Sequence, residues 1–439
     1  MRDLVVFLFF LSILPLALSN AFVAFLLWTW AGLVAINSYL YGFMTAIPMV
    51  QVFAVLTLAL VLIPSMRQGM VYRSSGVVLI FLLIVVHGFF SAAFAYPGLP
   101  HNWIIYTNMV KTILLCMFMP LFITNRHRIN IYVMLVAGAV CFHGLLDGLK
   151  FIASGGGHNA YGIPKFGDNN HYALILLMAL PLLLYIYRYA QARLLRWAAV
   201  AVFFLTFFAV LATHSRGALL TLMAIGFWLI LMSKRKIMGV IIAAMLVTLT
   251  MQFAPSNWFD RMDTIKTAGE DRSFMGRITA WKRASAIALE NPVLGGGFHA
   301  GQGVSIYEQF RYKQGLLGFV ETPDTGYAAA THSIYFEVLG DLGFVGFLLF
   351  MAALASVFYN RRRILRRVSE DPARLEWAGD LANFIAAGIV AYMVGGAALS
   401  AAYFELPYYL IMLMQVLWHV VDQPQEDMNS EQVKGGGHA

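Results

Sequence analysis

The chain has 439 residues, of which 60% are hydrophobic and only 12% charged, and its mean hydropathy is +0.72. Soluble globular domains carry about 25% charged residues, so this composition excludes an ordinary soluble protein. The two cysteines, Cys116 and Cys141, both lie in apolar stretches. They exclude a disulfide framework and a cysteine metal cluster.

In chain order, the apolar residues form runs long enough to cross a hydrocarbon core of about 30 Å as helices. The runs do not alternate between polar and apolar residues as the strands of a membrane barrel would. The sequence therefore predicts an all-α polytopic membrane protein with about twelve transmembrane helices. The apolar runs lie near residues 4–36, 48–64, 77–95, 103–123, 129–152, 171–187, 195–212, 217–233, 237–254, 333–359, 381–400 and 404–421. The first run is interrupted at Ser19-Asn20 and could cross once or twice.

The basic residues gather in alternate connections between these runs, which explains most of the formal net charge of +8. The positive-inside rule places such connections in the cytoplasm, together with the C-terminus. No nucleic-acid partner is needed, because the cations are scattered over short loops rather than gathered on one folded face. The cations are Arg67, Arg73, Arg126, Arg128, Arg188, Arg193, Arg196, Lys234, Arg235, Lys236, Arg361, Arg362, Arg363, Arg366, Arg367 and Arg374.

The same pattern divides the chain into four regions. Residues 1–254 hold the N-terminal transmembrane helices, and 255–332 form one large outward segment with amphipathic helices, balanced in charge. Residues 333–421 hold the last transmembrane helices. Residues 422–439 are polar and are expected to be a disordered cytoplasmic tail.

Two outward connections carry unusual polar residues. Arg216 follows His214-Ser215 at the start of a helix, where a cation opposes the macrodipole and calls for an anionic partner. The alternative is a snorkelling interfacial arginine. In the connection 153–170, Asp168 or Asn169 can cap the next helix. A cap does not explain why Lys165, Asp168, Asn170 and His171 fall within seven residues.

The large outward segment predicts an amphipathic helix that ends before Pro292. Arg277 and Trp281 are one turn apart and share a face of this helix. The run Gly295-Gly296-Gly297 follows, whose backbone N–H groups could meet an anion. It lacks the Lys-Ser/Thr of a phosphate loop, so a simple turn is the alternative.

His332 stands at the outer boundary of the next span, with Tyr335 near it on the helix and Glu337 pointing elsewhere. The alternative for His332 is a capping or interfacial histidine. A helical zinc site needs histidines and acids four residues apart, so we predict no metal ligand here and no cofactor. Three glycines spaced by three residues allow close helix packing: Gly340, Gly343 and Gly346.

Two ionisable residues fall within apolar runs, Lys111 and Asp147. Each is costly in hydrocarbon if unpaired. The sequence therefore predicts a mutual ion pair or, alternatively, a cavity that opens outward.

These motifs, in this order and on one side of the membrane, resemble the bacterial O-antigen ligase family. That family lies within the superfamily of O-antigen ligases, O-antigen polymerases and protein O-glycosylation ligases. The resemblance covers roughly residues 150–360, through Ser215-Arg216-Gly217, Arg277-x3-Trp281, Asn291-Pro292 and His332 with Glu337. Phe166 to His171 also resemble the ligases found near exosortase systems.

The resemblance implies a GT-C-like membrane glycosyltransferase in the bacterial inner membrane, with its active site facing the periplasm. It would move a glycan from undecaprenyl diphosphate to a hydroxyl of lipid A-core, in a metal-independent, inverting reaction of lipopolysaccharide biosynthesis. His332 would be the catalytic residue, and Arg216 and Arg277 would bind the diphosphate. Weaker candidates for the substrate pocket are Lys165, Asp168, Asn170, Tyr335 and Glu337.

Other functions remain open on the sequence alone. Within the superfamily, the chain could be a protein O-glycosylation ligase or an O-antigen polymerase, which differ in the acceptor. From another class, a transporter or lipid flippase would show ionisable residues at mid-membrane depth and repeat symmetry. A non-enzymatic assembly partner would use the outward segment for binding.

Overall fold

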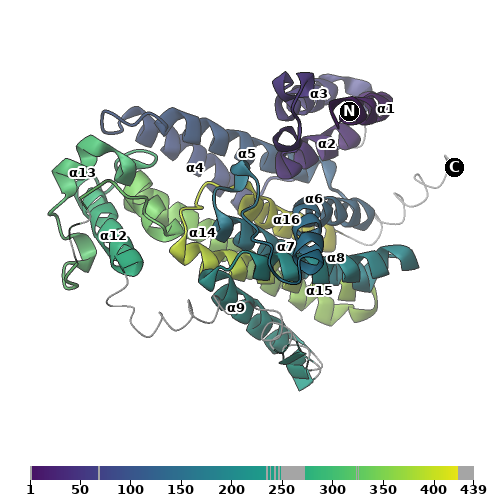
Figure 1. The fold of residues 1–439 in the computed structure, drawn as a ribbon. Coiled ribbons are helices and arrows are strands. Elements are labelled where there is room, and N and C mark those ends of the chain that lie inside the picture. The colour runs from purple at the N-terminus through teal and green to yellow at the C-terminus, as the bar shows by residue number, and fades with distance from the viewer. Residues whose placement is uncertain are drawn as a thin grey trace.

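A computed structural model describes residues 2–423 apart from 68–69, 234–235, 238, 242–243, 246–247, 249–271, 323 and 325. Most of the predicted span 237–254, the first part of the outward segment and nearly all of the polar tail lie outside the described residues. The secondary structure of the described residues consists of helices without a strand (Figure 1).

The first half of the chain forms α1 (Arg2–Ser19), α2 (Ala21–Val34), α3 (Met49–Leu62), α4 (Gly76–Ala93), α5 (Asn102–Phe122), α6 (Arg126–Ala153), α7 (Asn169–Tyr189), α8 (Arg193–Ala212) and α9 (Arg216–Met232). Its short 3-10 helices are η1 (Ile36–Tyr39), η2 (Phe43–Ala46), η3 (Pro64–Arg67) and η4 (Pro164–Phe166). The second half forms α12 (Arg272–Glu290), α13 (Val304–Phe310), α14 (Ile334–Glu370), α15 (Pro372–Gly395) and α16 (Glu405–Val421), with η6 (Ala300–Gln302), η7 (Gly315–Leu317) and η8 (Gly396–Ala398).

Eight of the described helices are long and apolar enough to cross a membrane, namely α1, α4, α5, α6, α7, α8, α14 and α15 with its extension η8. Four shorter apolar helices, α2, α3, α9 and α16, accompany them. The predicted all-α polytopic membrane fold is therefore confirmed, while the number of spans stays a prediction.

The first apolar run is two helices rather than one. Asn20 breaks the run and caps α2, because its side chain accepts a hydrogen bond from the N–H of Phe22. The carboxylate of Asp3 accepts hydrogen bonds from the N–H groups of Gly42 (3.0 Å) and Met44 (3.1 Å). The start of α1 thus lies beside the connection between α2 and α3, so α1 and α2 run in opposite directions.

The predicted cytoplasmic connections and the predicted outward connections lie at opposite ends of the helices. Contacts between connections that are distant in the sequence show this. At one end, which we call the loop end, Ala160 bonds to Ala212 and Asn169 to Thr213. At the other, which we call the basic end, Arg188 pairs with Asp380 (2.8 Å). The connections that the charge pattern assigns to one side therefore also contact one another in the structure.

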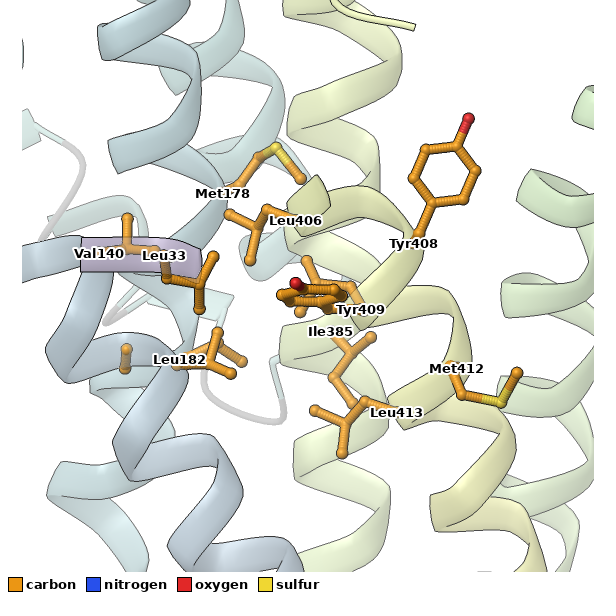
Figure 2. Packing of buried hydrophobic residues seen from close by; sticks show 14 of the residues in the cluster. Leu33, Val140, Met178, Leu182, Ile385, Leu406, Tyr408, Tyr409, Met412 and Leu413 are labelled. Carbon is orange, nitrogen blue, oxygen red and sulfur yellow. The ribbon is translucent and has the colours of Figure 1, made fainter. Parts of the chain in front are cut away.

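The core lies where α7, α15 and α16 meet, and α7 is buried along most of its length. Figure 2 shows Met178 of α7, Ile385 of α15 and Tyr409 of α16 within this cluster. Gly388 lets α15 approach α7 closely, because a Cβ there would stand 2.7 Å from the carbonyl oxygen of Met178.

The helix α14 is longer than the predicted span 333–359 and continues through the arginine-rich stretch to Glu370. An i, i+3 pair between Arg367 and Glu370 (3.1 Å) supports its last turn. The helix is broken at Gly343, which has φ 66° and ψ −171°. The spacing of the three glycines predicts close packing but not this break.

We expect Gly388→Ala to lower the thermal unfolding temperature, since overpacking a tight contact costs about 1–3 kcal/mol. Gly138→Ala in α6 is the matched control, because a Cβ there meets nothing within 4 Å. Tryptophan fluorescence of both variants in detergent checks this. Equal unfolding temperatures for the two variants would show that the α7–α15 approach is not tight.

Candidate functional site

A cavity of about 390 Å³ opens at the loop end, between the η4 loop and the starts of α5, α7, α14 and α16. Its apolar lining includes Ile105, Leu174 and Ile175. Its polar wall combines two histidines with two acids and a lysine. The polar side chains are Asn108, Thr112, Lys165, His171, His299, Glu337, Ser400, Tyr403 and Glu405.

His171 connects α7 to the segment between α15 and α16. Its Nδ1 lies 3.0 Å from Oδ1 of Asp168, and its Nε2 lies 2.9 Å from the carbonyl oxygen of Ser400. Both partners are acceptors, so both ring nitrogens donate. His171 therefore carries a positive charge in this arrangement.

Of the two caps that the sequence allows, Asp168 is the one that caps α7, because its carboxylate accepts from the N–H groups of Asn170 and His171 (both 2.9 Å). Burial raises the pKa of Asp168, but the hydrogen bonds from His171 and Asn170 outweigh it and hold the pKa well below its ordinary value. Asp168 is therefore an anion beside the cavity.

His332 lies beside this cation rather than in the cavity wall. Its backbone N–H donates to Oγ of Ser400 (2.8 Å), whose carbonyl oxygen accepts from His171. Burial lowers the pKa of His332, and the charge of Arg277 lowers it further. Asp168 opposes this effect. The ring of His332 is therefore held neutral at neutral pH.

Arg277 reaches this place through the packing of α12. One turn further on, Trp281 donates from Nε1 to the carbonyl oxygen of Thr331 (2.8 Å) and stacks on Phe336 with ring centroids 5.1 Å apart. Trp281 thus fixes the residue before His332 against the helix that carries Arg277. The predicted helix before Pro292 is confirmed as α12.

Arg216 begins α9, as predicted, and Ser215 caps this helix by accepting from the N–H of Ala218 (3.2 Å). The hydroxyl of Ser215 donates to Oδ1 of Asn170 (2.7 Å). Asn170 therefore joins the start of α9 to the start of α7, and Arg216 stands at the same end of the bundle as His332.

Glu337 lies in the cavity wall, with only 3% of its surface exposed. One carboxylate oxygen accepts from the N–H of Ala402 (3.0 Å), and the other lies 3.4 Å from Nε2 of His299. The sequence predicts that Glu337 points away from His332. In the structure its side chain lines the cavity.

His299 is a residue of this site that the sequence analysis does not single out, although it follows the glycine run by two residues. Burial lowers its pKa, but the hydrogen bond with Glu337 and the charge of Asp341 outweigh this and raise the pKa above its ordinary value. The Asp341 carboxylate also accepts from the N–H of His299 (2.9 Å) and the hydroxyl of Tyr403 (3.0 Å). His299, Glu337 and Asp341 thus form one buried polar group.

Backbone conformation offers a signal that the sequence does not show. Of the four non-glycine residues with positive φ among the described positions, three are histidines at the loop end, His214, His299 and His332. Such conformations are costly for side-chain-bearing residues and concentrate at functional sites. The three positive φ angles therefore indicate that the functional site lies at the loop end.

Two weaker candidates have partners within the protein. Lys165 lines the cavity, where it pairs with Glu405 (3.0 Å), another lining residue, and it donates to the carbonyl oxygen of Gly32. The hydroxyl of Tyr335 donates to the carbonyl oxygen of Met393 (2.8 Å) and so serves the packing of α14 on α15.

The glycine run does not form an anion site. The N–H of Gly295 donates to the carbonyl oxygen of Asn291. The N–H groups of Gly296 and Gly297 donate to the carbonyl oxygens of Gly340 (2.9 Å) and Asp341 (3.0 Å), respectively. All three donors are used within the chain, so the simple turn is the correct alternative. The turn clamps the break in α14.

The predicted ion pair between Lys111 and Asp147 is wrong. Asp147 is bound by Lys150 (2.9 Å), Nε2 of His158 (3.0 Å) and the hydroxyl of Tyr172 (2.9 Å). Lys111 is exposed on α5 and donates to Asn108, which lines the cavity. The partners of Asp147 come from its own helix α6, from the connection that follows it and from α7.

We expect Asp168→Ala to destabilise the protein by about 1 kcal/mol, the usual effect of losing a helix cap. Asp168→Asn retains a good cap and should lose less. Thermal unfolding of the two variants in detergent measures the difference. An equal loss in both would mean that the charge pair with His171, rather than the cap, is what matters.

Comparison with known families gives two matches. Residues 201–351 match the family described as O-antigen ligase. Residues 1–191 match a family of unknown function. No curated protein matches the chain. The matched O-antigen ligase region runs from α8 into α14 and contains Arg216, Arg277, His299, His332 and Glu337.

Proposed function

Since the chain carries an O-antigen ligase family domain over residues 201–351, we propose that it is an O-antigen ligase of the bacterial inner membrane. It transfers a glycan from undecaprenyl diphosphate to a hydroxyl of lipid A-core on the periplasmic face. Protein O-glycosylation ligases and O-antigen polymerases of the same superfamily differ in the acceptor, so the acceptor is part of the test.

One observation carries the proposal: Trp281, on the helix of Arg277, donates to the carbonyl oxygen of Thr331, and the next residue, the half-buried His332, is held by Ser400 at the loop end. The neutral ring of His332 can take a proton, and the guanidinium of Arg277 can bind phosphate oxygens. The charge balance of the connections supports the loop end as the periplasmic side.

In the proposed reaction, the acceptor hydroxyl oxygen attacks the anomeric carbon from the face opposite the diphosphate, and His332 takes its proton. The bond from the anomeric carbon to the diphosphate oxygen breaks, and its electron pair leaves with undecaprenyl diphosphate. Arg216 and Arg277 stabilise the charge that develops there. The product is an inverted glycosidic bond, formed without a metal.

The remaining polar residues act by position in this proposal. Asp168 and His171 hold Ser400, whose hydroxyl in turn binds the backbone of His332. Glu337 and His299 line the neighbouring cavity, which is large enough for part of a sugar substrate. The transporter alternative gains no specific support from these contacts.

The direct test is transfer by purified protein from carrier-linked glycan to lipid A-core. We expect His332→Ala, Arg216→Ala and Arg277→Ala each to lose about 100-fold or more in rate. His101→Ala and Arg311→Ala, which alter other loop-end residues, are matched controls and should stay within about twofold of the native rate. Native activity in His332→Ala would refute its role as base, and loss of native activity with a chelator would refute the metal-free reaction.

The acceptor is tested in the same assay. Replacing lipid A-core by an acceptor protein or by a second carrier-linked glycan distinguishes the three activities of the superfamily. We expect product with lipid A-core alone.

The pH profile gives a second test. His332 must be neutral to act as base, and its pKa lies below the ordinary value of about 6.5. The ratio kcat/KM should therefore fall only as the pH drops below that value. Arg277→Gln removes a nearby cation, so the pKa of His332 should rise and the acid limb of the remaining activity should move to higher pH. Arg311→Gln is the control, and an unmoved acid limb in Arg277→Gln would separate Arg277 from His332.

A further inference from the structure

A second cavity, of about 490 Å³, lies at the basic end between the start of α4, the second half of α14 and the end of α16. The helix α16 connects the two cavities, since Glu405 lines the first and Asp422 the second. Seventeen residues of helix span about 25 Å, close to the thickness of a hydrocarbon core. The second cavity therefore stands at the opposite membrane boundary from the candidate active site.

Two arginines line this cavity without an ion-pair partner among the described residues, Arg73 and Arg363. Arg73 donates to the carbonyl oxygen of His419 (3.4 Å), and the guanidinium of Arg363 lies 3.8 Å from the ring centre of Trp418. The cavity also contains Asp422, but this carboxylate is paired with Arg367 (2.7 Å). The lining thus keeps a positive charge.

The start of α4 adds neutral donors to the same wall. Ser74, Ser75 and Gly76 line the cavity, and Ser75 caps α4 by accepting from the N–H of Val78. The N–H groups of the first helical turn have no acceptor within the helix, and they favour an anion.

One buried acceptor in the cavity wall has no hydrogen-bond partner among the residues that the structure describes. Asn360 is 2% exposed, and its amide nitrogen donates to Gln415 (2.8 Å), which in turn contacts Nε2 of His419 (2.8 Å). Oδ1 of Asn360 remains unpaired, and all three of these residues line the cavity. A buried carbonyl of this kind calls for a donor such as a hydroxyl group.

We propose that this cavity binds the headgroup of an anionic phospholipid that carries a free hydroxyl, as phosphatidylglycerol does. Arg73, Arg363 and the start of α4 bind the phosphodiester, and Oδ1 of Asn360 accepts from a headgroup hydroxyl. Basic pockets between membrane helices are suited to anionic headgroups.

The surroundings favour a lipid over a soluble phosphate ester with the same chemistry. Ile80 lines the cavity on its membrane side, and beside it α4 exposes Leu79 while α14 exposes Tyr359 with 63% of its surface. Acyl chains can lie on these apolar faces while the headgroup enters the cavity. Trp418 and Tyr359 are the aromatic residues typical of a membrane boundary.

Lipid binding to the purified full-length protein in detergent tests this proposal without any transfer reaction. Native mass spectrometry or a thermal-shift titration would compare phosphatidylglycerol, phosphatidylmethanol and phosphatidylcholine. We expect phosphatidylglycerol to bind tightest, phosphatidylmethanol several-fold more weakly because it has the charge but no hydroxyl, and phosphatidylcholine weakest.

The double variant Arg73→Gln/Arg363→Gln should weaken phosphatidylglycerol binding at least tenfold. Arg366→Gln, an exposed arginine on the same helix that does not line the cavity, is the matched control and should change binding less than twofold. Asn360→Leu should remove the preference for phosphatidylglycerol over phosphatidylmethanol.

Three results would overturn the proposal. They are native binding in the double variant, equal binding of phosphatidylglycerol and phosphatidylcholine, and displacement of the lipid by sn-glycerol 3-phosphate or inorganic phosphate at equal concentration. The last result would assign the cavity to a soluble phosphate ester. Because only binding is measured, each outcome is independent of whether the chain proves to be a ligase.

Discussion

The break of α14 at Gly343 is the constraint on which the loop end depends, because backbone groups freed within a membrane helix must find partners inside the protein. Three carbonyl oxygens before the break accept from Gly296, Gly297 and the ring of His87, and the N–H of Phe344 donates to the carbonyl oxygen of Pro292. This clamp docks the turn 292–300 onto α14. It thereby sets His299 against Glu337 and Asp341, and it brings α12, with Arg277, beside the start of α14.

The residues of the site consequently come from several helices rather than from one sequence motif. Ser400 binds both His171 and the backbone of His332, Trp281 binds Thr331, and Ser215 binds Asn170. These contacts join α7, α9, α12, α14 and the segment before α16 at one membrane boundary. The proposed reaction between two lipid-anchored substrates would need its chemical groups at that depth. A second cationic cavity stands at the opposite boundary of the same helices, where it would meet the headgroups of the other leaflet.

The sequence predicts the structure correctly where a local property decides it. Apolar runs predict the membrane helices, Asp168 or Asn169 is predicted to cap α7, and the amphipathic pattern predicts the helix α12. The sequence does not predict contacts whose partners come from elsewhere in the chain. Asp147 binds Tyr172 and His158 rather than Lys111. The N–H groups of the glycine run donate to carbonyl oxygens at the break of α14 rather than to an anion. Helical spacing shows only that Glu337 points away from His332. It cannot show that Glu337 points into a cavity formed with other helices.

By itself, the sequence determined that this chain is a helical membrane protein, and it sorted the connections into two groups. Hydrophobicity and charge act on each segment separately, so they can be read residue by residue. Only the tertiary structure decided which loop-end residues meet. It placed the backbone of His332 against Ser400 and its ring within the field of Arg277, brought His299 from the glycine-rich turn into the cavity wall, and left Tyr335 to helix packing. These contacts depend on the break at Gly343 and on how distant helices pack, and neither follows from the local preferences of the residues involved.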